Sequence, residues 1–352
     1  MPRFKKWKKK SHGTNTKYTM KDRLIWIDLL KLLAIFLVIL GHVIITFHPL
    51  NEGPYDRILL IYIYSFHMPL FMFISGYLSR KIKNGIYDIK GRFYQLIVPT
   101  VSCYFLFYIL GYSQHNLWFL PCLFMCYFLT SCIYYLLNCI SKNSIINNVV
   151  IVCVLFLCIS VFNKIPIINK YKLDFMLPFF IVGVNYDITR KYSRYITIII
   201  LLITILFLLF WNKQYIYYFS KTDYINYHLL FDLNKNFLVI DNLIKVLYRF
   251  FTGYFVSISF FIIFSSLKLK SIVFQKLSKF GLYTLQIYIV QTLVLEHNFF
   301  NFHFRDNYPC YYNIFITPFI SICVLIICLL IIKTVEKNRI IDILFFGNRK
   351  KY

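Results

Sequence analysis

Residues 23–46, RLIWIDLLKLLAIFLVILGHVIIT, form an apolar stretch that is long enough to cross a bilayer as a helix. After Arg23 at its start, the stretch nevertheless carries Asp28, Lys31 and His42 in its interior. Ionisable groups inside spanning helices usually face a bundle interior or a water-filled cavity, and they often mark a functional site. This segment therefore predicts a helix that belongs to a larger membrane bundle and carries one polar face.

Helical geometry places the ionisable residues of this segment on that shared face. At about 100° per residue, Lys31 and His42 return to within about 20° of each other, about 16 Å apart along the axis. Asp28 precedes Lys31 by three residues and can pair with it. The residues could be a structural ion pair and a hydrogen-bonded histidine, or they could line a functional cavity. Spacing alone does not choose between these two interpretations.

The composition extends the membrane interpretation to the whole chain. Of the 352 residues, 59% are hydrophobic and 20% are aromatic, whereas soluble domains are about 45–50% apolar. Ten apolar runs approach or reach spanning length. They are residues 24–45, 58–78, 93–112, 117–140, 145–162, 173–188, 195–211, 242–267, 280–296 and 314–332. The predicted fold is an all-α, polytopic membrane bundle of about ten transmembrane helices.

The charge pattern predicts how this bundle is oriented. With ten spans, the large majority of the 39 lysines and arginines fall on the side of the N-terminus. Cytoplasmic loops show such an excess, so both termini are predicted to be cytoplasmic. Basic tails, residues 1–23 and 334–352, then flank a membrane domain of residues 24–333 in the lipid bilayer.

The same pattern excludes other classes of protein. Membrane orientation accounts for the net charge of +25, and no nucleic-acid-binding motif is visible, so no nucleic-acid partner is expected. The ten cysteines show no metal-ligand or disulfide spacing. We therefore predict no metal site.

The second apolar run contains the motif SFHMPLFMFISGY, residues 65–77. Pro69 can kink the helix and free a backbone carbonyl, while Ser75 and Gly76 allow close approach of another helix. His67 lies in the outer half of its helix, as His42 does. It could border the same cavity, or it could be structural.

Basic residues gather before the third run. The motif KGRFYQLIVP, residues 90–99, contains Lys90 and Arg92, and Arg80 and Lys81 precede it closely. Topogenic charge explains these residues most simply. Alternatively, they form a cationic mouth for the phosphates of an anionic cofactor such as coenzyme A.

The outer segment 212–241 is rich in side chains that suit a sugar. It holds Tyr215, Tyr217, Tyr218, Tyr224 and Tyr227, together with Asp223, His228 and Asp232. Aromatic faces and carboxylates suit a glycan acceptor, but an interfacial aromatic belt explains the tyrosines equally well. Trp118 in HNLWFLP is expected to belong to such a belt.

Four motifs occur in order along the chain: GH eleven residues after Lys31, then FHMPLFMFISGY, KGRFYQLIVP and LWFLPCLF. Together they resemble the acyltransferase-3 group of integral membrane O-acyltransferases, in particular the branch of fucose 4-O-acetylase-like proteins and polysaccharide acetylases. The resemblance covers the chain in helix number and order, and the sequence match is concentrated in its first third. It implies transfer of an acetyl or other acyl group from cytoplasmic acetyl-CoA, or another acyl-CoA, to a hydroxyl of a cell-envelope glycan. It also implies the cytoplasmic (inner) membrane of a bacterium.

The family's characteristic positions are only partly kept. Its arginine, separated by ten intervening residues from an intramembrane histidine, falls on Lys31 with His42, so lysine keeps the charge but lacks the planar fork of arginine. Its pair of arginines falls on Arg92 and Gln95, of which only the first is kept. The late motif GLYTLQIYIVQ often carries histidine where Gln291 stands.

A mechanism follows from the chemistry of these residues. A sugar hydroxyl is a poor nucleophile, and a positioned base is worth about 10² to 10⁴ in rate. His42 is the candidate base, with a covalent acyl-histidine as a variant. His67 or a free N–H near Pro69 could stabilise the oxyanion. The remaining candidates are Lys31 with Asp28 on the donor side of the cavity, and Arg92, Lys90, Arg80 and Lys81 for the coenzyme A phosphates.

Two other functions fit the same sequence. Charges inside a ten-helix bundle also suit a transporter or flippase of a small anion or a glycan intermediate, although no inverted repeat is visible. A non-catalytic component could use its polar face only to bind partner helices.

Overall fold

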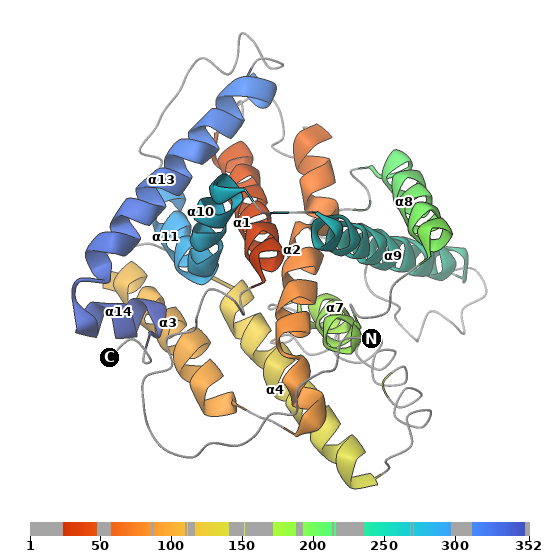
Figure 1. Cartoon of the computed structure of the whole chain (residues 1–352), viewed down its shortest axis with the longest axis horizontal. Coiled ribbons are helices and arrows are strands. Elements are labelled where there is room, and N and C mark those ends of the chain that lie inside the picture. The colour runs from red at the N-terminus through yellow and green to blue at the C-terminus, as the bar shows by residue number, and fades with distance from the viewer. Residues whose placement is uncertain are drawn as a thin grey trace.

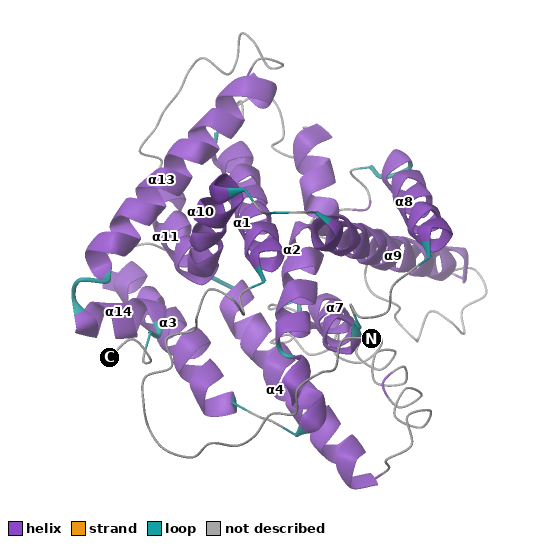
Figure 2. Cartoon of the chain, in the orientation of Figure 1, coloured by secondary structure: helices purple, strands orange, loops and turns teal. Residues whose placement is uncertain are grey.

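The computed structural model describes residues 24–47, 58–85, 88–109, 111, 117–140, 151, 172–187, 193–212, 215, 236–267, 269, 271–296 and 312–348. All regular structure in these ranges is helical (Figure 2). The α-helices are α1 (Ile25–Thr46), α2 (Ile58–Leu78), α3 (Ile89–Ile109), α4 (Phe119–Ile140), α7 (Leu173–Asn185), α8 (Arg194–Leu209), α9 (Asn236–Ser266), α10 (Ile272–Phe280), α11 (Thr284–Glu296), α13 (Thr317–Val335) and α14 (Arg339–Phe346). Shorter turns are η3 (Arg80–Asn84), η8 (Gly281–Tyr283) and η10 (Tyr312–Ile316).

The predicted all-helical membrane fold is confirmed over the described residues. Each predicted apolar run overlaps a described helix, except 145–162, which lies outside the described residues apart from Ile151. Helices α1, α2, α4, α9 and α13 are long and apolar enough to cross a membrane, and α7 and α8 are shorter apolar helices. The cytoplasmic placement of the termini stays a prediction. The structure adds α10, and it adds α14 within the range that the sequence assigns to a basic tail.

Helix α1 lies in the middle of the bundle, between α2 on one side and α10, α11 and α13 on the other (Figure 1). It has no proline and only one glycine, so its apolar sequence continues as a helix until Phe47. More than half of the helix is buried. A residue on almost any face of α1 therefore meets another helix, which explains how the segment tolerates ionisable side chains.

Helices α2 and α7 pack through a reciprocal contact of glycines. A Cβ atom at Gly76 would collide with the carbonyl oxygen of Phe180, and one at Gly183 would collide with that of Phe73. Small residues allow such close backbone approach in membrane helices. The expected packing role of Gly76 is confirmed, whereas its neighbour Ser75 lines a cavity.

Helices α8 and α14 lie at the edges of the bundle. Helix α8 packs on α9, where the hydroxyl groups of Thr204 and Ser259 are 2.7 Å apart. Helix α14 packs on α3, and Gly347, just after it, approaches the backbone of Tyr94 so closely that a side chain would not fit. The C-terminal segment is thus fixed against the beginning of α3.

Candidate active site

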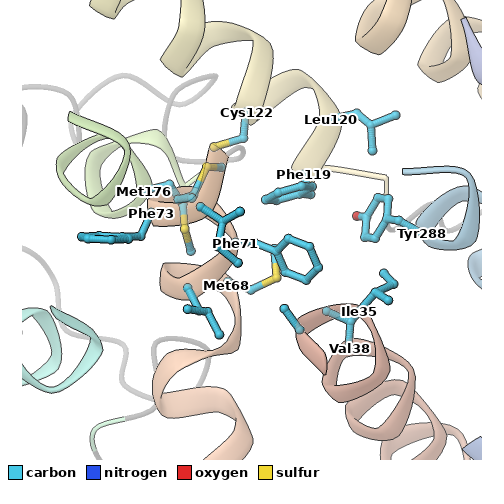
Figure 3. Packing of buried hydrophobic residues seen from close by; sticks show 14 of the residues in the cluster. Ile35, Val38, Met68, Phe71, Phe73, Phe119, Leu120, Cys122, Met176 and Tyr288 are labelled. Carbon is cyan, nitrogen blue, oxygen red and sulfur yellow. The ribbon is translucent and has the colours of Figure 1, made fainter. Parts of the chain in front are cut away.

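A cavity of about 210 Å³ lies at the end of the bundle where α1, α3 and α11 begin and α2 ends. Figure 3 shows the packed hydrophobic side chains beside it, where Ile35 and Val38 of α1, which line the cavity, lie opposite Phe71 of α2. Phe119 of α4 packs edge-on against Phe71 and Tyr288, with ring centroids 5.8 and 5.5 Å apart. The polar side chains that line the cavity, tyrosines aside, are those of Lys31, Ser75, Ser79, Arg92, Gln95, Thr284 and Gln286. The cavity therefore combines a polar region with an aromatic wall.

One stripe of α1 leads along this cavity. Lys31, Ile35 and Val38 line it at successive helical turns, and His42 lies one turn beyond Val38. The predicted ion pair is confirmed, because Lys31 Nζ lies 2.7 Å from a carboxylate oxygen of Asp28. Asp28 is buried and Lys31 is 18% exposed. The stripe thus runs from a paired charge at the basic end of α1 to the partly buried imidazole of His42.

Of the four candidate phosphate-binding residues, Arg92 alone lines the cavity. Its guanidinium donates to Gln95 Oε1 at 2.8 Å and lies 5.0 Å from the centre of the Tyr127 ring. Arg80, Lys81 and Lys90 are exposed and are not part of the cavity wall. They lie close to it, because Ser79 and Arg92 both line the cavity.

His42 bonds to a residue that is distant in sequence. Its Nδ1 lies 3.0 Å from Oε1 of Gln291 on α11. Gln291 is fully buried. The imidazole is therefore held between α1 and α11.

His67 belongs to the same region of the bundle as His42. It is buried, and its Nδ1 lies 2.7 Å from the carbonyl oxygen of Ile63 on its own helix. A carbonyl oxygen can only accept, so Nδ1 of His67 carries the proton. His67 also lies within electrostatic range of His42 and Lys172.

Trp118, which the sequence assigns to an interfacial belt, contacts Lys172. The Lys172 ammonium lies 4.5 Å from the centre of the Trp118 ring, as in a cation–π contact. Lys172 immediately precedes α7 and has a left-handed backbone, with φ of 53°. Burial lowers the pKa of Lys172 to about 7.

Sequence reasoning missed Gln286 and gave Gln291 no role. Gln286 lines the cavity, is 8% exposed, and its Oε1 has no hydrogen-bond partner among the described residues. Both glutamines lie in the apolar run 280–296. The criterion that singles out His42, a polar side chain inside a spanning segment, would also have found them.

The predictions for the aromatic outer segment and for metal binding concern residues that the structure describes only in part. Of the outer segment 212–241, the structure describes Asn212, Tyr215 and the first turns of α9, and the other tyrosines lie outside. The Tyr215 ring packs against Tyr248, with centroids 4.6 Å apart. Within the described ranges, no group of histidine, cysteine, aspartate and glutamate side chains has the arrangement of a metal site.

Comparisons with known proteins identify the family of the chain. The acyltransferase-3 family, described as an acyltransferase domain, matches residues 24–333. The inner membrane protein YcfT of Escherichia coli (strain K12) is 39% identical over 77 residues, which are 19% of this chain and 22% of that protein. No solved structure matches. Because the family match covers nearly the whole helical bundle, the chain belongs to the acyltransferase-3 family, and its long apolar helices make it a multi-pass membrane protein.

Proposed function

We propose that this protein transfers an acetyl or similar short acyl group from cytoplasmic acyl-CoA to a hydroxyl of a cell-envelope or exported polysaccharide, with His42 as general base. One observation carries the proposal. The stripe of α1 that lines the cavity through Lys31 and Val38 continues to His42, which is bonded within the bundle. A thioester that enters from the basic end of the bundle would point toward this imidazole.

The proposed reaction has one proton acceptor and one leaving group. Nε2 of His42 takes the proton of the sugar hydroxyl while the hydroxyl oxygen attacks the thioester carbonyl carbon. The carbon–sulfur bond breaks, and the departing thiolate takes the proton from the imidazolium. The products are the ester of the sugar and free coenzyme A, and His42 returns to its neutral form.

The size of the cavity limits how the donor binds. Pockets that enclose a drug-sized molecule are about 300–1,000 Å³, whereas this cavity is about 210 Å³. Only the narrow acyl-bearing arm of coenzyme A fits inside, so the nucleotide stays outside. The exposed Arg80, Lys81 and Lys90 lie beside the cavity, where they suit the phosphates.

Two polar residues in the cavity wall suit the arm itself. The guanidinium of Arg92 is oriented by Gln95 and Tyr127 and suits a phosphate at the entrance. Oε1 of Gln286 lacks a partner among the described residues and can accept from an amide N–H of the arm. A cation for a phosphate together with an acceptor for an amide N–H suits a coenzyme A thioester better than a bare inorganic anion, which has no amide.

The polar residues around His42 and His67 suit binding of the acceptor. We call this region the histidine layer. Lys172 and Trp118 lie near this layer and offer a donor and an aromatic face to a sugar. This arrangement, with a donor cavity on one side and a polar layer beyond it, suits transfer across a membrane.

The decisive experiment uses the full chain, purified in lipid nanodiscs with acetyl-CoA and a panel of oligosaccharides. We expect His42→Ala to lower the rate of transfer by about 10² to 10⁴. Leu37→Ala is the matched control, because Leu37 is half-buried on the same helix but off the stripe. Unchanged transfer by His42→Ala would refute the role of His42. Counterflow of an anion or glycan in vesicles without any acyl donor would instead favour the transporter.

A second experiment tests the donor side. Arg92→Ala removes a charge-assisted contact worth about 1.5–3 kcal/mol, so KM for acetyl-CoA should rise about ten- to a hundredfold. Arg92→Lys should recover only part of this loss, since lysine lacks the planar fork. Lys276→Ala, which removes an exposed charge from α10, is the control. An equal effect of Lys276→Ala would mean that general charge, not Arg92, attracts the donor.

A further inference from the structure

The structure connects the candidate base to a residue of the last third of the chain. Gln291 lies on α11, a helix that packs against α1, and the exposed fraction of its side chain is 0%. Its Oε1 is 3.0 Å from Nδ1 of His42, a residue 249 positions earlier. A buried amide in an apolar helix is costly unless its polar atoms are used. The contact with His42 uses one end of this amide.

That contact decides which nitrogen of His42 can act as a base. An amide oxygen can only accept, so Nδ1 of His42 carries a proton when it bonds to Oε1 of Gln291. In the neutral imidazole, the lone pair is then on Nε2. The partner of one ring nitrogen commonly sets the tautomer of a functional histidine in this way.

The other end of the amide points to a ligand. Nε2 of Gln291 has no hydrogen-bond partner among the described residues, although it is buried. It is a few bonds away from the oxygen that holds His42, so it is close to any group that reacts there. The atoms that a reacting complex would place at this point are oxygens, either of the thioester carbonyl or of the acceptor hydroxyl.

We propose that Gln291 is the positioning residue of His42. Its Oε1 holds the imidazole with Nε2 presented to the acceptor, and its Nε2 donates a hydrogen bond to an oxygen of the reacting complex. This inference rests on the proposed role of His42 as a base. It assigns to α11 a part in the reaction that the motifs of α1 to α4 do not contain.

The test compares substitutions that separate the two ends of the amide. Gln291→Met keeps the length and the packing but removes both hydrogen bonds. We expect kcat for transfer from acetyl-CoA to fall about ten- to a hundredfold, the usual effect of removing the partner that orients a functional histidine. KM for acetyl-CoA should change much less, because Gln291 is not part of the donor cavity.

Gln291→Glu keeps an acceptor for Nδ1 but replaces the amide donor by a carboxylate. A negative charge beside the ring stabilises the imidazolium. The pH profile of kcat should therefore move to higher pH, with partial recovery of activity there. A residue that only fills space would not shift this profile, whichever substitution is made.

Thr292→Val is the matched control. Thr292 is a buried polar residue next to Gln291, but its hydroxyl donates to the Ile289 carbonyl of its own helix at 2.7 Å. We expect Thr292→Val to retain the kcat and the pH profile of the unmodified protein. Far-ultraviolet circular dichroism and the elution volume of each variant in detergent establish that it is folded.

The double variant His42→Ala with Gln291→Met separates this inference from the proposed function. The part of the effect that Gln291 exerts through His42 is already lost in His42→Ala, so Gln291→Met should slow His42→Ala by a smaller factor than it slows the unmodified protein, and the slowing that remains measures the hydrogen bond of Nε2. If His42→Ala is inactive but Gln291→Met has normal kcat and an unchanged pH profile, the role of Gln291 is refuted and that of His42 stands. If His42→Ala is fully active, the proposed base fails, and the inference fails with it.

Discussion

Helices α1 and α8 are about equally apolar, but they occupy opposite positions in the bundle. Helix α1 is packed by neighbours on several sides and contains Asp28, Lys31 and His42. Helix α8 packs on α9, and Thr204 is its only buried residue within its described span. Apolar composition therefore does not distinguish a central from a peripheral membrane helix. The ionisable side chains do, because only a packed helix can give them partners.

The ion pair on α1 should show the largest effect. Removal of one partner of a buried pair costs about 3–5 kcal/mol, so Lys31→Met and Asp28→Asn should each lower the free energy of unfolding in detergent substantially. The double substitution should cost less than the sum of the two. If the losses of the two single variants simply add in the double variant, the 2.7 Å contact does not couple the two residues. Ionisable pairing would then not distinguish α1 from α8.

The packing of α1 against its neighbours should give the next effect. A Cβ atom at Gly281 would collide with the carbonyl oxygen of Asp28, and overpacking typically costs about 1–3 kcal/mol. Gly281→Ala should therefore lower the melting temperature in detergent and reduce transfer as α1 shifts. Lys279→Ala, at an exposed site nearby, serves as the control. A normal melting temperature for Gly281→Ala would show that α1 is held less tightly than the structure indicates.

The polar contact of α8 should matter less. Hydrogen bonds between membrane helices are worth about 0.6 kcal/mol on average and at most about 1.7. Thr204→Val, which removes the contact with Ser259, should produce a loss in this range and leave kcat unchanged. Ser259→Ala should give the same loss, and the double variant no more. A larger loss of stability, or a drop in kcat, would show that α8 contributes to the packing or the catalysis of the bundle in spite of its peripheral position.

The exposed face of α8 should be the least sensitive. Leu202 is 60% exposed, and substitutions at such sites usually change stability by less than about 0.5 kcal/mol. Leu202→Ala should match the unmodified protein in melting temperature and in transfer. A clear loss of either would indicate that this face has a partner.

The sequence predicted what depends on local spacing. Lys31 follows Asp28 by three positions, and His42 follows Lys31 by eleven, so a helix alone determines that they share a face. The pair is confirmed, and the stripe from Lys31 to Val38 lines the cavity. The runs of apolar residues likewise predicted most helices, because burying backbone groups in lipid leaves few alternatives.

The sequence did not predict what depends on packing between distant segments. No local period connects His42 with Gln291, since their contact exists only where α1 meets α11. Proximity in sequence placed Arg92 with Arg80, Lys81 and Lys90, but the cavity is lined by Arg92 alone among them. Which of these side chains faces the cavity depends on the rotation of α3 about its axis and on where α2 ends. The burial of α1 and the exposure of α8 are equally a matter of neighbours.

The hydrogen bond of His67 to its own helix has a consequence for the movement of protons. Nδ1 of His67 is held by the Ile63 carbonyl, an oxygen that has no proton to give and cannot keep one. A proton that arrives at Nε2 must therefore leave by the same atom. His67 can exchange protons on one side only, so it ends a conducting chain instead of extending it. Through this contact, His67 therefore does not pass protons onward along α2.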